Sequence, residues 1–213
     1  MGKTKKERKN EKRIKLRNKK LFKQYPWLAP YENKGHHGIH GVVRTDWKYD
    51  YLFMEPEMDG WMKAFFYDLQ EGILTEIKSM NRNPRELRIQ EYKEKYGSMR
   101  LYLNDDNIES GIVENYSQLS ENVCFLCGRP DVPMIESSWY LPLCKKCYET
   151  TRHSKPYEEV AGKDARMPDE YSYTRYSKED GEQIITVSVK EEANRIRKRW
   201  NKKHPDDLVQ ISE

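Results

Sequence analysis

Four cysteines in two pairs are the residues of this 213-residue chain whose type and spacing point most directly to chemistry. Cys124 and Cys127 form one C-x2-C pair, Cys144 and Cys147 form the other, and sixteen residues lie between the pairs. Two cysteines three positions apart can bind one ion from a tight turn, and two such turns complete a tetrahedron. Gly128 follows the first pair, where a positive φ lets backbone N–H groups point at the sulfurs. The spacing predicts one structural zinc ion with no open coordination position.

The alternatives to a metal site are two disulfides or four unrelated thiols. We expect neither, because the chain opens on a charged segment without a signal peptide, which argues against an oxidising compartment. Arg129, Lys145 and Lys146 lie beside the cysteines, where they could offset the charge of four thiolates. No apolar run approaches the roughly 18–20 residues that a membrane span needs. The sequence therefore predicts a soluble, cytoplasmic protein with no membrane partner.

The net charge of +4 conceals an uneven distribution. Residues 1–24 hold twelve lysines and arginines against two glutamates, whereas residues 156–189 hold eight carboxylates against four cations. Residues 190–203 are basic again, with seven cations against two glutamates. Dense basic segments bind phosphate backbones by releasing counterions, with little sequence preference. The candidate nucleic-acid-binding residues are Lys5, Lys6, Arg8, Lys9, Lys12, Arg13, Lys15, Arg17, Lys19, Lys20, Arg195, Arg197, Lys198 and Arg199.

The first basic segment has almost no apolar side chains beyond Ile14, Leu16, Leu21 and Phe22, which is too little to bury. We therefore expect a flexible arm that is disordered or becomes helical on a partner. Trp139 and Tyr140, between the cysteine pairs, could stack on nucleic-acid bases.

A regular helix is the clearest element ahead of the cysteines. Apolar residues recur every fourth position from Trp61 to Ile77, which predicts a helix over about 61–80, and Asp59 can cap its start. The run Y-P-W-L-A-P at 25–30 ends any preceding helix and supplies a first apolar anchor. Residues 31–60 are expected to be rich in loops.

The other elements follow from shorter patterns. Residues 86–95 and 99–104 predict two strands joined near Gly97. A second helix is predicted over about 108–122, and it leads directly into the first cysteine pair, so the metal module should dock on the body. A short strand is expected over 183–189.

A last helix is expected to run to about residue 203. Ser188 and Glu191 have the spacing of a capping box at its start.

Together these patterns predict an α+β fold. Its parts are a flexible basic arm (1–24), a small helix-and-hairpin body (25–122), a docked four-cysteine zinc ribbon (123–151) and a C-terminal extension (152–213) with a basic helix at about 189–203. Hydrophobic residues make up 36% of the chain and charged residues 35%, which is lean for one compact core. Zinc would supply folding free energy that such a core lacks.

Several motifs resemble those of an uncharacterised protein family common in bacteriophages and prophages. They are Y-P-W-L from Tyr25, D-G-W from Asp59, K-E-K-Y-G-S-M-R from Lys93 and the paired C-x2-C turns, and together they cover about residues 25–148. Relatives often end the second turn with histidine where this chain has Cys147. The resemblance implies a phage or prophage origin and a bacterial host, and it supplies no activity.

Nucleases of the HNH type also use paired C-x2-C turns. They need an Asp-His or His-His pair between the turns, and residues 128–143 contain no histidine. His153 lies beyond the last turn and has no partner nearby in the sequence. The sequence therefore argues against this reaction.

Two further metal patterns are weaker. Glu91 and Lys93 have the E-x-K spacing of restriction-type nucleases, in which a carboxylate and a lysine on one strand face hold Mg²⁺ and polarise a water. The upstream acid that such a site needs is not evident. His36, His37 and His40 form a third candidate in a glycine-rich loop, where solvated histidines are the commoner case.

The sequence thus predicts a non-catalytic protein whose partner is nucleic acid or a nucleic-acid-handling complex, with no evident small-molecule substrate. The alternative is a protein-interaction module that inhibits or regulates a host protein, since aromatic residues at 46–58 suit a protein surface. Trp47, Tyr49 and Phe53 alternate as in an amphipathic strand, which could instead pack on the 61–80 helix. A metal-dependent nuclease is a minor alternative.

Overall fold

The computed structural model describes residues 4–33, 41–43, 46–136, 139–151, 156–177 and 181–213. Within them the helices are α1 (Lys5–Gln24), α2 (Gly60–Ser79), α3 (Asp106–Ile108), α4 (Glu114–Ser120), α5 (Lys145–Glu149) and α6 (Lys190–Lys203), with a 3-10 turn η1 (Pro26–Leu28) and a π-helical turn η2 (Glu109–Val113). The strands are β1 (Tyr31–Asn33), β2 (Gly41–Val43), β3 (Ile89–Lys95), β4 (Ser98–Leu103), β5 (Met134–Glu136), β6 (Tyr140–Pro142), β7 (Glu170–Ser177) and β8 (Gly181–Ser188). In the described residues they pair as antiparallel hairpins, β1–β2, β3–β4, β5–β6 and β7–β8. The predicted α+β class is confirmed.

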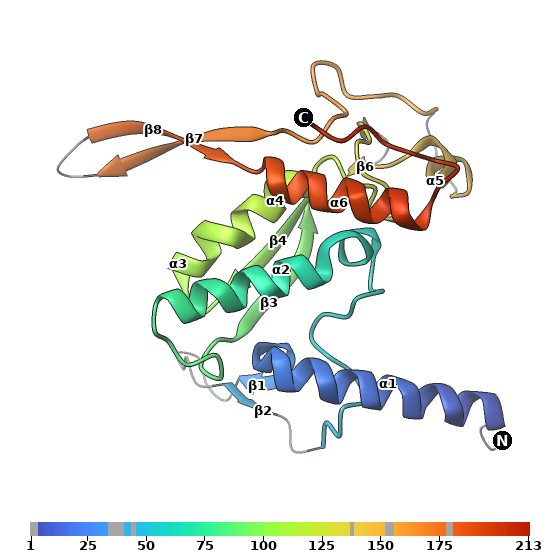
Figure 1. The fold of residues 1–213 in the computed structure, drawn as a ribbon, viewed down its shortest axis with the longest axis vertical. Helices are drawn as coiled ribbons and strands as arrows, with labels where there is room; N and C mark the ends of the chain where they lie inside the picture. Colours follow the sequence, from blue (N-terminus) through green and yellow to red (C-terminus); the bar gives the residue numbers. More distant parts are fainter. Residues whose placement is uncertain (1–3, 34–40, 44–45, 137–138, 152–155, 178–180) are drawn as a thin grey trace.

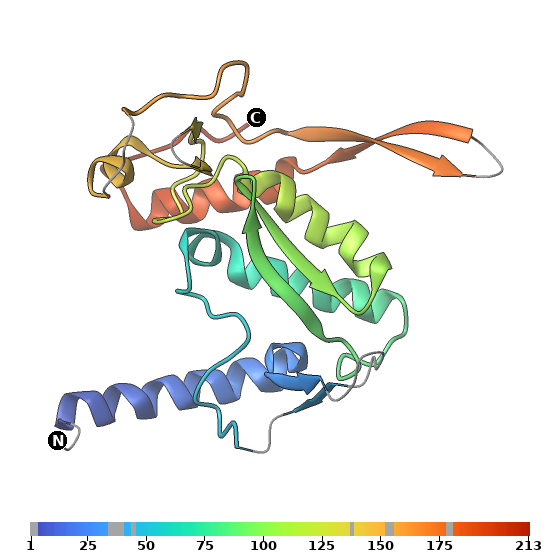
Figure 2. The same ribbon diagram turned by 180° about the vertical axis from the view of Figure 1, so that it is seen from behind.

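Helix α2 lies at the centre of the fold (Figure 1). The side chains of Trp61, Phe65 and Leu69 are completely buried, as their spacing predicts. Asp59 caps the helix by accepting a hydrogen bond from the Met62 N–H at 2.8 Å. The β3–β4 hairpin covers one side of α2, and α6 packs along another (Figures 1 and 2). Residues of α2 and of the C-terminal helix α6 therefore belong to one hydrophobic core.

The predicted hairpin is confirmed, with a shorter first strand and a second strand that begins and ends one residue earlier than expected. Met99, Leu101 and Leu103 alternate on β4 and are all buried in the same core as α2. Tyr96 and Gly97 both have positive φ, which fits the tight turn between the strands.

The predicted helix over 108–122 is wrong as one continuous element. The segment is divided into α3, η2 and α4, because Gly111 has non-helical dihedral angles (φ −97°, ψ −110°). A Cβ at Gly111 would lie 2.6 Å from a carboxylate oxygen of Glu76, which receives the Ile112 N–H at 2.9 Å. The buried face nevertheless continues across the kink, with Ile108 and Tyr116 fully buried.

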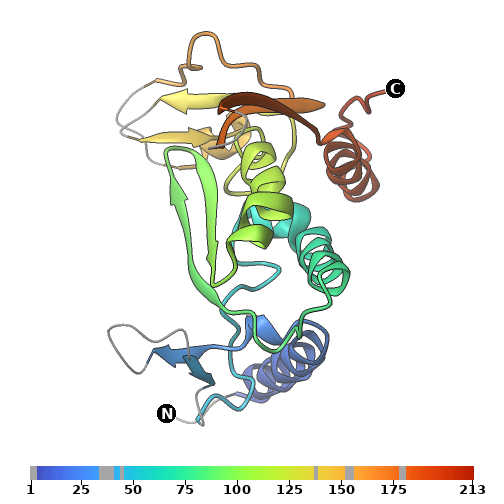
Figure 3. The same ribbon diagram turned by 90° about the vertical axis from the view of Figure 1, so that its left-hand side faces the viewer.

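The basic N-terminal segment is one long helix, α1, which docks on the body by its second half (Figure 1) and is seen nearly end-on in Figure 3. The Asn18 side chain is fully buried and donates a hydrogen bond to the Tyr49 carbonyl at 3.0 Å. Arg17 binds Glu55 at 2.7 Å, and Leu21 is buried. The expectation that this segment buries nothing is wrong. The polar contacts of Asn18 and Arg17 with the body add to the apolar contacts of Leu21 and Phe22.

Residues 46–53 do not form the predicted strand. Lys48 and Tyr49 have positive φ, which turns the chain back on itself. Trp47 is buried and packs against Phe22 of α1, with ring centroids 5.0 Å apart. Tyr49 also packs against Phe22, at 5.9 Å, so these two aromatic residues help to hold α1.

The C-terminal part contributes more regular structure than its sequence indicates. The short strand expected over 183–189 is half of a long hairpin, β7–β8, that projects from the body (Figure 1). Helix α6 is confirmed, but the capping box is wrong. Val189 is the N-cap, and Ser188 pairs with Glu170 in the hairpin and donates its hydroxyl to the Asp169 carbonyl at 3.5 Å.

Candidate metal centre

The four cysteines lie together at the junction of the β5–β6 hairpin and α5. Their sulfur atoms are all within 4.8 Å of one another, and none forms a disulfide. The Sγ atoms of Cys127 and Cys144 are 3.8 Å apart. Four thiolates placed tetrahedrally about 2.3 Å from zinc would be separated by about 3.8 Å. The cluster can thus hold one metal ion, and its geometry and all-sulfur donor set fit zinc.

The close approach of the sulfurs shifts the pKa values of three cysteines. The pKa of Cys124 is lowered to about 2 because its sulfur accepts hydrogen bonds from the Cys127 and Cys144 thiols. The pKa of Cys127 is raised because it is the donor in such a bond, and burial together with the Cys124 charge raises the pKa of Cys147 to about 12. Zinc binds the thiolate form of cysteine, so protons and the metal would compete for these sulfurs.

The first cysteine turn docks directly on the start of α2. The Gly60 N–H donates to the Phe125 carbonyl at 2.6 Å, and the Trp61 indole donates to the Val123 carbonyl at 2.9 Å. The Trp61 and Phe125 rings meet edge to face at 4.9 Å. Docking of the metal module on the body, which its position after a helix predicts, is confirmed.

Two glycines allow this close approach. A Cβ at Gly60 would lie 2.1 Å from the Cys124 carbonyl oxygen. A Cβ at Gly128 would lie 2.5 Å from the Gly60 carbonyl oxygen, and Gly128 has φ +84°. Gly128 therefore serves both the turn, as its position indicates, and the contact with α2.

Gly60→Ala is expected to separate the cysteine turn from α2. The methyl group meets backbone on the opposite side, which cannot rotate away, so we expect a loss of about 1–3 kcal/mol in the free energy of unfolding. Chemical denaturation of the zinc-loaded protein measures it. Gly162→Ala is a comparison at a glycine with nothing within 4 Å of its added Cβ, although its φ of +77° adds local strain. A loss at Gly60 no larger than at Gly162 would contradict the role of close approach.

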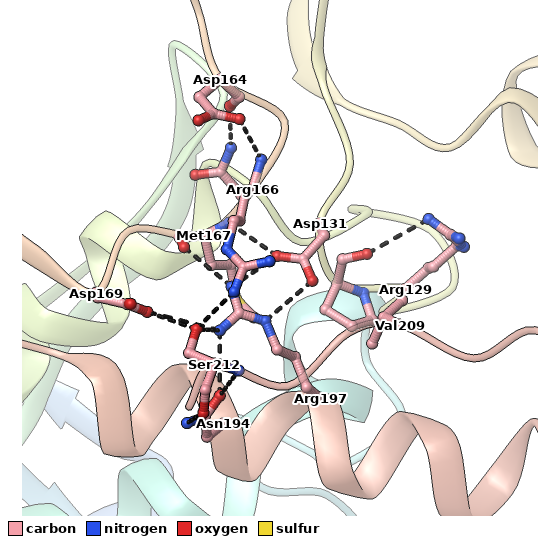
Figure 4. A network of polar contacts seen from close by, with 12 residues as sticks. Arg129, Asp131, Asp164, Arg166, Met167, Asp169, Asn194, Arg197, Val209 and Ser212 are labelled. Carbon is pink, nitrogen blue, oxygen red and sulfur yellow. Dashed lines mark hydrogen bonds and ion pairs between the residues drawn. The ribbon is translucent and has the colours of Figure 1, made fainter.

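Arg197 joins the metal module to the C-terminal part, and Figure 4 shows the network around it. Its guanidinium is fully buried and binds both carboxylate oxygens of Asp131, at 2.9 and 3.0 Å. It also donates to the Met167 carbonyl, Asn194 and Ser212. Four segments of the chain are thus tied to one cation. No sequence signal marks this network, because its members are far apart in the chain.

A second ion pair involves Arg129, which follows the first cysteine turn. Arg129 binds Asp207 of the C-terminal tail through its Nε, at 2.9 Å from the carboxylate. This pair lowers the pKa of Asp207 below its ordinary value. The positive charge near the cysteines that the sequence predicts at Arg129 is present, and it also fixes the tail.

The predicted phosphate-binding residues divide into free and engaged groups. Arg197 cannot contact nucleic acid, because it is buried and fully paired, so its assignment is wrong. Arg199 binds Asp68 at 2.7 Å and the Ala64 carbonyl, and Arg195 binds Glu192. Of the predicted residues on α6, Lys198 alone is exposed and makes no ion pair within the described part of the chain.

On α1 the docked half is likewise engaged. Arg17 holds Glu55 and Glu57, and Lys15 binds Asp50 at 2.6 Å. The remaining predicted cations of α1 are exposed, and they are Lys5, Lys6, Arg8, Lys9, Lys12, Arg13, Lys19 and Lys20. Trp139 and Tyr140 are exposed as predicted, and the Trp139 indole donates to Glu94 at 2.8 Å.

The nuclease patterns gain no support from the geometry. Lys93 and Glu91 bind each other at 2.5 Å on the exposed surface of β3. Among the residues that the structure describes, the four cysteines are the one group of three or more potential metal ligands. His36, His37, His40 and His153 lie outside the described residues.

Comparisons with known proteins add no relative. No protein-family model matches the chain, and neither the curated proteins nor the solved structures include a significant match. Of the helices in the described residues, none has the length and apolar character to cross a membrane.

Proposed function

We propose that this protein binds nucleic acid without catalysis, in a phage or prophage setting within the bacterial cytoplasm. The observation that carries the proposal is α1, whose first half extends from the body as a fully formed helix with exposed lysines and arginines. Such a helix can follow a phosphate backbone, since each contact releases a condensed counterion. The metal module serves as structure in this proposal, because four thiolates leave zinc no open position.

A nucleic-acid-handling complex is the larger assembly into which such a protein would fit. The origin from a phage or prophage rests on the motif resemblance of residues 25–148. It assigns the protein to a bacterial host and says nothing of which nucleic acid is bound.

A second candidate is a module that binds and regulates a host protein. The β7–β8 hairpin favours it, because a two-stranded hairpin alone is marginally stable. Its residues Ile184 and Tyr173 are exposed, Ile184 to 75%. A partner protein could cover these side chains.

Neutralising the free half of α1 tests the proposal. We expect Lys5→Gln, Lys6→Gln, Lys9→Gln and Lys12→Gln, combined in one variant, to weaken binding to a single-stranded oligonucleotide. The slope of log affinity against log salt should fall by about 3, since each lost phosphate contact removes about 0.7. Fluorescence anisotropy across a salt series measures both quantities.

The matched control carries arginine at the same four positions, which keeps the charge and the helix. These side chains are exposed, so neither variant should alter the docked half of α1. Equal affinity and equal slope in the glutamine variant and the wild type would overturn the proposal.

A further inference from the structure

A groove of about 690 Å³ lies between α2 and α6 and is distinct from the metal cluster. Met62 and Phe66 of α2 form its buried apolar floor, and Tyr67 is exposed to 47% at its side. Pro56, from the segment before α2, closes another side. The groove thus combines an apolar floor with the accessible ring of Tyr67.

The wall that α6 contributes is strongly basic. Lys198, Lys202 and Lys203 line it and are exposed, and within the described residues no carboxylate is paired with them. Two further cations line the groove, and they are Lys63 and Arg199. The charge of the wall therefore calls for an anionic ligand.

The nearby acids do not cancel this charge. Glu57 lines the groove, and it is held by Arg17 of α1. Asp68, on the next part of α2, is held by Arg199 at 2.7 Å. The contact between Arg17 and Glu57 also places α1 beside the groove.

We propose that this groove holds a single strand of nucleic acid, with its phosphates along Lys198, Lys202 and Lys203 and a base against Tyr67. The inference rests on the proposed function and names the site and the strandedness of the ligand. Base stacking on an aromatic ring tolerates any sequence, and a basic wall tracks the backbone.

A single strand fits this groove better than a duplex. A duplex keeps its bases stacked on one another, so it has no free base face for Tyr67. An acidic peptide would meet the same lysines, but the exposed ring of Tyr67 beside them gives a nucleic-acid base a face to stack on.

The test compares groove variants of the full zinc-loaded chain by anisotropy with a thymidine oligonucleotide and with a duplex. We expect Tyr67→Ala to weaken single-strand binding by about 5- to 150-fold, the measured range for loss of one stacked base, and to leave duplex binding unchanged. Tyr67→Phe keeps the ring and should retain affinity. The triple variant Lys198→Ala, Lys202→Ala, Lys203→Ala should lower the salt slope by about 2.

A matched triple variant removes three exposed lysines elsewhere, and they are Lys48, Lys78 and Lys95. If the groove variants behave like this control while the glutamine variant of α1 loses binding, the groove is excluded and the proposed function stands. If the wild type binds neither nucleic acid, both fail.

Two further readouts complete the test. Loss of polyglutamate binding, without loss of single-strand binding, in the groove variants would overturn the inference in favour of an acidic peptide. Photo-crosslinking of the wild type to the oligonucleotide gives an answer even if a variant misfolds. A crosslinked peptide that contains Tyr67 supports the site, and crosslinks confined to α1 contradict it.

Discussion

Cys124→Ser is expected to abolish stoichiometric zinc binding and to unfold the segment from Cys124 to Cys147. Structural zinc contributes about 10–16 kcal/mol of binding free energy in zinc-finger peptides near pH 7, which equals or exceeds the stability of a typical domain. The apolar cluster of this segment is small, and two of its buried members are the metal-binding residues Cys124 and Cys144 themselves. Metal analysis of the purified chain and amide hydrogen exchange measure the two effects.

Chelation of the wild type should reproduce the variant, which supplies an internal control. Exchange should rise first in the β5–β6 hairpin and α5, while the buried strands of β3–β4 stay protected, because they pack on α2 through apolar side chains. Chelator should have no further effect on Cys124→Ser. Zinc affinity should fall as the pH falls, since protons then compete for the thiolates. A wild type that contains no zinc, or a variant with unchanged exchange, would refute the metal centre.

Arg197→Met is expected to cause the largest loss of stability among substitutions away from the cysteines. It leaves Asp131, whose side chain is only 16% exposed, without its bidentate partner. Removing one member of a buried ion pair costs about 3–5 kcal/mol. The variant also loses the hydrogen bonds to the Met167 carbonyl and to Ser212. The C-terminal tail should loosen near Ser212 but stay attached, because Arg129 still binds Asp207. Urea denaturation measures the loss.

A double-mutant cycle separates the pair from the packing of the helix. Arg197→Met combined with Asp131→Asn removes both charges and should recover part of the loss. Asparagine tolerates the positive φ at this position and keeps an acceptor for the Met167 N–H. Lys78→Met, at an exposed position, should have little effect. A loss below about 1 kcal/mol in Arg197→Met would show that the network does not hold the segments together.

Local patterns predicted the elements that depend on neighbours in the chain. The spacing of the cysteines and of Trp61, Phe65 and Leu69 is set within a few residues, and the structure confirms both. The Asp59 cap is equally local, since its partner is the Met62 N–H. Periodicity and capping are properties of single helices and turns, so one sequence is enough to recognise them.

Long-range polar contacts could not be predicted in the same way. The pair of Arg197 and Asp131 joins residues 66 positions apart, and no spacing rule covers such a distance. Docking of α1 depends on buried Asn18, which a hydrophobic pattern treats as a solvent-facing residue. Ser188 has the right type and spacing for a cap, but it pairs with Glu170 as the last residue of β8. Tertiary contacts decided each of these cases against the local preference.

The most direct test of the proposed function is to purify the full chain at low salt, with and without nuclease, and to measure what remains bound. The account predicts that untreated protein carries nucleic acid, that added salt releases it, and that the glutamine variant of α1 retains far less. A preparation free of nucleic acid, with one stoichiometric protein partner that survives nuclease, would contradict it.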